Sequence, residues 1–170
     1  GQDGDNEIFV MNTDGSGQTK LTNNSLGDVE PAWSPDGRSI VFSADVPAAT
    51  GGANGEHEAE PRVTEVRRLH YRHDTLGWRG DSHFHLFLAD VTSGATTQLT
   101  DGDWDDTGPV WSPDGANIAF VSGRKEDRDV QAGTEAFVIS LPGGEPQLWS
   151  EGLAGVGGLA WSPHSDRLVA

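Results

Sequence analysis

The pentapeptide WSPDG occupies Trp33–Gly37 and returns unchanged at Trp111–Gly115, and a weakened copy, WSPHS, occupies Trp161–Ser165. A phenylalanine stands 24 residues before each of the three tryptophans, at Phe9, Phe87 and Phe137. Three equal spacings in one short chain indicate an internal repeat. Internal repeats of this kind are the sequence signature of propellers and related arrays.

Each repeat reads as four short strands joined by tight turns. The strand types are PAWS (Pro31–Ser34), SIVFSAD (Ser39–Asp45), EIFVMN (Glu7–Asn12) and QTKLT (Gln18–Thr22). Four short strands in roughly 40–45 residues are typical of one propeller blade, so we predict an all-β fold, a segment of a β-propeller. The residues expected to be structural in this repeat are Phe9, Trp33, Asp36, Gly37, Phe87, Trp111, Asp114, Gly115, Phe137 and Trp161.

The phase of the repeat predicts two complete four-stranded blades flanked by half-blades, about three blade equivalents in one partial domain. Its parts are 1–30 (the last two strands of a first blade), 31–108 (a full blade with an insertion at 46–84), 109–157 (a second full blade) and 158–170 (the first two strands of a last blade). Because closed propellers typically have at least four blades, we consider two possibilities. A second copy closes the ring as a homodimer, or the segment belongs to a longer protein.

The composition of the chain limits the classes of partner that it is expected to bind. The chain has 27 acidic and 11 basic residues and a net charge of −16, which disfavours binding to nucleic acid and to anionic membranes. There is no cysteine, and therefore no disulfide or thiolate metal site. No apolar run approaches the ~18 residues of a membrane span. We expect a soluble protein, with the cytoplasm favoured over the periplasm, whose partners are proteins or peptides.

Asp3–Phe42 resembles the repeat of TolB-type propellers, and Arg67–Val91 with Gln98–Asp129 resembles the N-terminal propeller of prolyl oligopeptidase family enzymes, especially acylaminoacyl-peptidase-like members. The second resemblance implies a propeller that caps an α/β-hydrolase domain and filters substrates, with the catalytic Ser, Asp and His in that hydrolase domain. The chain has no Gly-x-Ser-x-Gly elbow, since Gly15-Ser16-Gly17 reads as a hairpin turn. We expect a non-catalytic gating segment without a cofactor; the alternative is a standalone TolB-like module that binds proteins.

The insertion carries the candidate binding residues, because propellers place function on such loops. These residues are Trp78, Arg79, His83 and His85. With His70 and His73 the two histidines form a cluster that raises the alternative of a zinc site, but the spacings match no defined metal signature, so we expect none.

The aspartates before the second WSPDG raise the alternative of a calcium loop. They are Asp101, Asp103, Asp105 and Asp106. An EF-hand loop needs glycine at position 6 and glutamate at position 12, and those positions hold Asp106 and Ser112. We therefore expect these carboxylates to cap turns.

Overall fold

The structure is a computed structural model that describes residues 5–47, 72–73, 77–78, 82–126, 128, 130, 133–153 and 155–170. The strands are β1 (Phe9–Val10), β2 (Thr19–Lys20), β3 (Asp28–Trp33), β4 (Ser39–Val46), β5 (Arg72–His73), β6 (Gly77–Trp78), β7 (His83–Asp90), β8 (Thr96–Gln98), β9 (Asp106–Trp111), β10 (Asn117–Ser122), β11 (Glu135–Ser140), β12 (Gln147–Leu148), β13 (Ala160–Trp161) and β14 (Leu168–Val169). The described residues contain no helix, which confirms the predicted all-β class.

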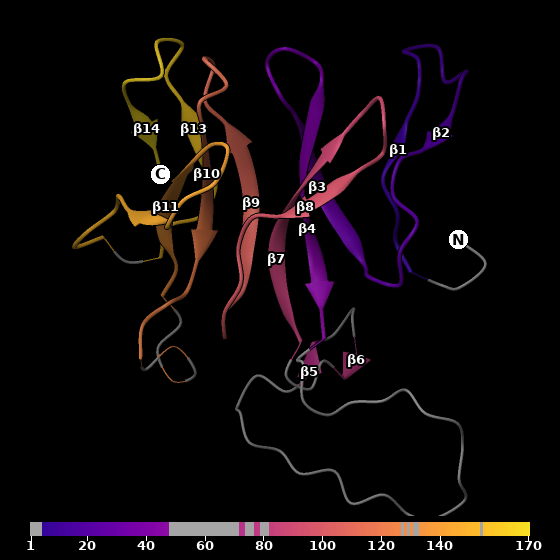
Figure 1. The fold of residues 1–170 in the computed structure, drawn as a ribbon. Helices are drawn as coiled ribbons and strands as arrows, with labels where there is room; N and C mark the ends of the chain where they lie inside the picture. Colours follow the sequence, from indigo (N-terminus) through magenta and orange to yellow (C-terminus); the bar gives the residue numbers. More distant parts are fainter. Residues whose placement is uncertain are drawn as a thin grey trace, which may run out of the picture.

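Two four-stranded antiparallel sheets form the body of the molecule (Figure 1). The first full blade is β3-β4-β7-β8, and the second full blade is β9-β10-β11-β12, each in chain order. An N-terminal strand pair, β1–β2, and a C-terminal strand pair, β13–β14, flank them. Sequential antiparallel strands with short turns are the arrangement of a propeller blade.

The predicted insertion lies between β4 and β7. Its described part holds one further strand pair, in which Arg72 pairs with Trp78 and His73 with Gly77. Residues 62–72, whose apolar pattern suggests either an extra strand or an extended blade edge, lie outside the described residues apart from Arg72 in β5.

The hydrophobic core lies between successive blades. Val41 and Leu86 of the first full blade pack against four side chains of the second, Ile118, Phe120, Phe137 and Ile139. A second cluster, built around Ile8, Ile40 and Phe42, joins the N-terminal strand pair to the first full blade. The apolar face of each blade is therefore buried by its neighbour, and this burial holds the blades together.

The three turns related to WSPDG share one backbone conformation, and they lie side by side at the top of Figure 1. Their last residues have positive φ: 69° at Gly37, 73° at Gly115 and 59° at Ser165. Glycine adopts such a φ without steric cost, whereas a side chain costs roughly 1 kcal/mol there. The third turn thus keeps the geometry of the repeat at the expense of backbone strain in Ser165.

The aspartate of the turn holds it closed. Asp36 Oδ1 accepts hydrogen bonds from Ser34 Oγ at 2.7 Å and from Arg38 N at 3.1 Å, and Asp114 accepts the equivalent bonds from Ser112 and Ala116. In the third turn histidine stands in its place. There Ser162 Oγ donates instead to the carboxylate of Asp166, at 2.5 Å.

The repeated tryptophan joins one blade to the blade before it. Trp111 Nε1 donates to the backbone oxygen of Ala32 at 3.1 Å, and Trp161 Nε1 donates to that of Val110 at 3.2 Å. In both cases the acceptor is the residue immediately before the tryptophan of the preceding blade. The same side chain therefore packs between the blades and fixes their register.

Candidate functional site at the polar junction between the two full blades

The lower ends of the blades are held by a hydroxyl group that recurs in every repeat. In each repeat a buried backbone N–H donates a hydrogen bond of 2.8–2.9 Å to the hydroxyl of the threonine or serine that lies 14 residues later in the chain. The pairs are Ile8 with Thr22, Leu86 with Thr100, and Ala136 with Ser150. This hydroxyl lies at the end of the fourth strand type in all three repeats, which is the sequence signal that would have revealed it.

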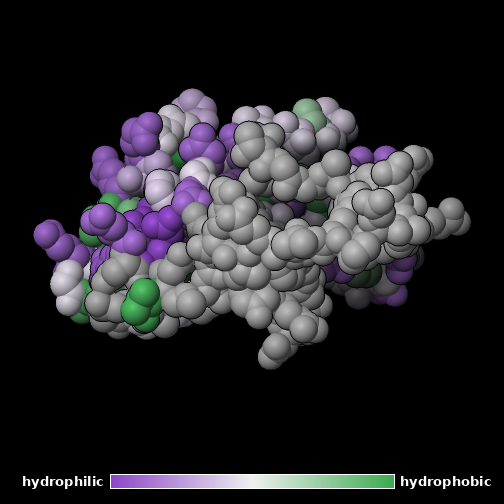
Figure 2. Space-filling model, turned by 90° about the horizontal axis from the view of Figure 1, so that it is seen from below, coloured by the Kyte–Doolittle hydropathy of each residue, from purple (hydrophilic) through white to green (hydrophobic). Residues whose placement is uncertain are grey.

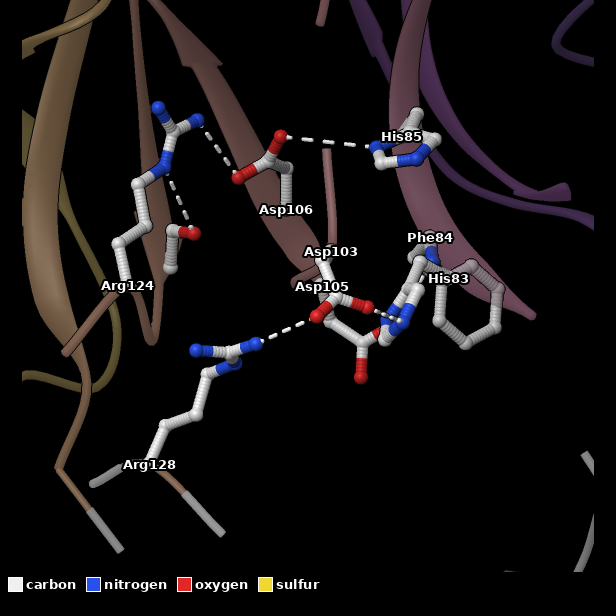
Figure 3. A network of polar contacts seen from close by, with 9 residues as sticks. His83, Phe84, His85, Asp103, Asp105, Asp106, Arg124 and Arg128 are labelled. Carbon is white, nitrogen blue, oxygen red and sulfur yellow. Dashed lines mark hydrogen bonds and ion pairs between the residues drawn. The ribbon is translucent and has the colours of Figure 1, made fainter. Parts of the chain in front are cut away.

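His83 and His85 lie on β7 at the end of the insertion, two residues apart, with ring centroids 6.4 Å from each other. His83 contacts two carboxylates of the loop that leads into the second full blade. Its Nε2 lies 3.2 Å from Asp103 Oδ1, and its Nδ1 lies 3.5 Å from Asp105 Oδ1 (Figure 3). Asp105 also accepts the backbone N–H of Phe84 at 2.8 Å. The start of β7 is thereby tied to the start of β9.

Asp106 is the centre of the second part of this network. It is fully buried, and its Oδ1 accepts a hydrogen bond from Arg124 Nη2 at 2.9 Å. Its Oδ2 lies 3.8 Å from Nδ1 of the buried His85, a contact that becomes an ion pair when the imidazole is protonated (Figure 3). Arg124 also donates from Nε to Ser122 Oγ at 3.1 Å.

Three aromatic rings surround the Arg124 guanidinium. Its Cζ lies 4.5 Å from the ring centroid of Phe137, 4.8 Å from Trp104 and 5.5 Å from Phe120. The face of an aromatic ring attracts a cation. Gly102 makes room for this arrangement, since a Cβ there would lie 2.4 Å from the Trp104 ring. Sequence reasoning missed both Arg124 and Trp104, because neither belongs to the repeat.

We call the set formed by His83, His85, Asp103, Asp105, Asp106, Arg124 and Arg128 the polar junction. Arg128 joins it through Asp103 Oδ2, at 2.6 Å from Nη2. Its hydroxyl neighbour Ser122 is buried and bonded to an arginine rather than to an imidazole. The arrangement therefore lacks the nucleophile–base contact of a hydrolase within the described residues, and its chemistry is electrostatic.

A pocket of about 470 Å³ opens beside the junction. It is lined by Gln98, Leu99, Thr100, Asp101, Trp104, Arg124, Gly144, Glu145 and Pro146. Asp101 is exposed there and does not contribute to the junction, unlike the other three aspartates of the run. Those three were expected to cap turns, and the structure shows them bonded across to β7, Arg124 and Arg128 instead.

No family model matches the chain. The curated peptidase YuxL of Bacillus subtilis, itself called uncharacterised, is 29% identical over 137 residues, covering 78% of this chain and 20% of that protein. A TolB homologue of Chlorobium luteolum is 29% identical over 150 residues, covering 82% of this chain and 32% of that protein. The crystal structure of TolB from Acinetobacter baumannii matches 95% of this chain and 31% of its own, with a TM-score of 0.61 at 15% identity. The fold is that of a TolB-like β-propeller.

The TolB-like propeller segment spans a fifth to a third of the length of these two curated relatives. Its relatives include members of the two groups that the sequence resembled, TolB-like propeller proteins and peptidases.

Of the four predicted binding residues, the structure brings His83 and His85 together in the polar junction. Trp78 lies in β6, where only its backbone is described, and Arg79 lies outside the described residues, as does His70 of the histidine cluster. Within the described ranges, no group of three or more His, Cys, Asp or Glu side chains is arranged to hold a metal ion.

The lower face of the propeller segment is mostly hydrophilic where described residues are visible (Figure 2). Green, hydrophobic residues are scattered there rather than gathered. In the described part of the chain, no helix is long and apolar enough to cross a membrane.

Proposed function

We propose that residues 1–170 act as a non-catalytic propeller module that binds a protein or peptide and, in the parent protein, controls access to a peptidase domain. The observation that carries this proposal is the likeness to the peptidase of Bacillus subtilis over 78% of the chain. The polar junction supports it, because His85 of the first full blade meets Asp106 and Arg124 of the second there without an activated nucleophile among the described residues.

The test uses the complete reading frame that encodes this segment. We expect a Gly-x-Ser-x-Gly elbow in the few hundred residues after Ala170, and cleavage of acylaminoacyl or prolyl chromogenic peptides that a serine-directed inhibitor abolishes. Residues 1–170 alone should not cleave these peptides. Inhibitor-sensitive turnover by the purified segment, or a reading frame without the elbow, would contradict the proposal.

The second candidate function is a standalone TolB-like module that recruits protein partners. It is favoured by the TolB homologue of Chlorobium luteolum, which matches this chain over 82% of its length. A reading frame that continues with further blades and then stops is the outcome expected from this alternative. Affinity capture with the whole encoded protein would then return a protein partner and no peptidase activity.

We further propose that the open faces of the segment receive additional blades, which for residues 1–170 alone means a second copy in a closed homodimer. Trp33 is 51% exposed, whereas the equivalent Trp111 and Trp161 each donate to the preceding blade. The backbone oxygen of Ala160, just before Trp161, would be its acceptor in a second copy. Light scattering should give twice 18.1 kDa, and a monodisperse monomer would exclude the homodimer.

A further inference from the structure

A second pocket, of about 480 Å³, lies at the opposite end of the blades from the polar junction, between the first two WSPDG turns. Its apolar surface comes from Pro35, Leu88, Trp111, Leu141 and Pro142. The carboxylates of Asp36 and Asp114, one from each turn, are exposed at this pocket. We call this pocket the turn groove.

The next pair of turns is bridged by a side chain. Between the second and third turns, Asp114 N donates to Ser165 Oγ at 3.1 Å and bridges the two loops. In the turn groove the residue equivalent to Ser165 is Gly115, which has no hydroxyl to offer Asp36 N. A Cβ built on Gly115 would lie 3.8 Å from Pro35 Cδ, an ordinary contact. Position 115 therefore leaves the first two turns without the side-chain bridge that joins the second turn to the third.

The two carboxylates stay ionised around neutral pH. The hydrogen bond from Ser34 Oγ holds the pKa of Asp36 below its usual range, helped by the backbone N–H of Arg38. Ser112 Oγ and the backbone N–H of Ala116 act in the same way on the pKa of Asp114. Each of these bonds uses Oδ1, and no hydrogen bond to Oδ2 of either carboxylate is present among the described residues.

We propose that the turn groove binds an arginine side chain of a partner protein or peptide. The aliphatic stem of arginine would cover Leu88 and Leu141, and the planar guanidinium would reach both carboxylates with separate N–H donors while lying against Trp111. The net charge of −16 adds long-range attraction for a basic segment. This inference deepens the protein-binding part of the proposed function, and its test measures binding rather than peptidase activity, so either can fail without the other.

The test is a titration of the 170-residue chain with a short capped peptide that carries one arginine, followed by the methyl signals of Leu88 and Leu141 in NMR spectra. A matched peptide with citrulline, which keeps the shape and loses the charge, should bind at least about fivefold more weakly. Equal binding of the citrulline peptide would overturn the proposal. Equal binding of a lysine peptide would replace it with an unspecific cation site.

Charge-removing variants locate the site. Asp36→Asn and Asp114→Asn keep an oxygen for the turn and lose the charge, so each should weaken arginine binding about two- to fivefold. Asp14→Asn is the control, because Asp14 caps a different turn through Ser16 and lies outside the groove. Unchanged affinity in both groove variants, or an equal loss in the control, would contradict the assignment.

Two glycine variants test the shape. Gly115→Ser should place a hydroxyl between the two turns as Ser165 does, bridge to Asp36 N, narrow the groove and weaken binding at least about fivefold. Gly37→Ser has the same strain, since its φ is 69°, but a Cβ there meets no atom within 4 Å. It should leave binding unchanged. If the two variants lower the affinity equally, backbone strain explains the effect and the groove is not the site; if Gly115→Ser fails to fold, the aspartate variants still decide.

Discussion

The junction before the first full blade and the junction before the second occupy the same place in the repeat but contain different chemistry. At the first, Glu7 and Asp28 bring two carboxylates together, and Lys20 Nζ lies 2.7 Å from Glu7. At the second, histidine replaces the glutamate, so that His85 faces Asp106 and an arginine completes the pair. The same backbone thus accepts an acid–acid contact in one place and an acid–base contact in another.

The shared hydroxyl explains why this exchange is possible. Thr22 and Thr100 accept the same buried backbone N–H at both junctions, so the backbone is satisfied independently of the charged residues around it. The charged side chains are then free to differ between blades. The comparison teaches that the hydroxyl belongs to the fold, whereas the ionic partners distinguish one junction from the other.

The largest expected effect is a difference in stability between variants of Asp106 and Asp103, the buried and the exposed aspartate of the polar junction. Asp106→Asn leaves the Arg124 guanidinium charged in a mostly buried site, so the free energy of unfolding should fall by about 3 kcal/mol. Urea unfolding measures it. Asp103→Asn is the matched control, because its exposed contact with Arg128 should cost at most about 1 kcal/mol. Similar losses of stability in the two variants would show that the buried Asp106–Arg124 pair contributes no more than the exposed Asp103–Arg128 pair.

The shared hydroxyl is tested next. Thr100→Val leaves the Leu86 N–H buried without an acceptor and should cost about 1–3 kcal/mol. Thr22→Val should cost at least as much, because Thr22 also donates to Glu7 Oε2 at 2.8 Å. Thermal unfolding of both variants, with the exposed Thr97→Val as control, checks this. A loss at only one of the two sites would break the claim that they are equivalent.

A third junction extends the comparison to the C-terminal strand pair. Ser165→Gly removes the positive-φ strain of about 1 kcal/mol but also the hydrogen bond to Asp114 N, so we expect a net gain of about 0.5 kcal/mol. In the isolated chain, amide exchange over 158–170 should be faster than over Ile118–Val121 and should slow in this variant. Faster exchange in the variant would mean that the hydrogen bond outweighs the strain.

The smallest expected effect concerns Asp28. Burial raises the pKa of this carboxyl above its ordinary 3.8, helped by the nearby charge of Glu7, against the opposing hydrogen bonds of Thr22 and Asn24. A raised folded-state pKa means that this group adds stability as the pH falls through that pKa towards 3.8, and that it adds none at neutral pH.

Because burial disfavours the ionised carboxylate, Asp28→Asn should leave the free energy of unfolding at pH 7 unchanged or raise it slightly. On going from pH 7 to pH 4, the wild type should gain stability relative to this variant. Urea unfolding at both pH values measures the difference. A large loss at pH 7 would show that Asp28 needs its charge, as Asp106 does.

The sequence predicted the blades well because the repeat determines them. The recurring phenylalanine pairs with a second phenylalanine in the same sheet, Phe87 with Phe42 and Phe137 with Phe120, as stacked rings with centroids 5.7 and 5.9 Å apart. A spacing that recurs reports a shared geometry. Such a spacing can be found in the sequence without knowing which blades are neighbours in the fold.

The polar junction could not be predicted in this way, because its residues depart from the repeat. Arg124 takes the position that Val46 holds in the first full blade, and no spacing links it to Asp106 or Trp104. Glu30 is a similar case. It adopts φ 53° where the equivalent residue is Gly108, and its carboxylate accepts the Gly108 N–H at 2.7 Å. Only the folded arrangement of the two blades reveals such partners.

The tryptophan bond between blades has a consequence for how such rings grow. The donor is a side chain that every blade carries, and the acceptor is a backbone oxygen that every blade also carries, whatever its side chain. A duplicated blade therefore carries both the tryptophan donor and the backbone acceptor of this hydrogen bond, and it needs no compensating change in its neighbours. Duplication or deletion of one unit can therefore lengthen or shorten the ring, while the loops of each unit evolve separately towards new partners.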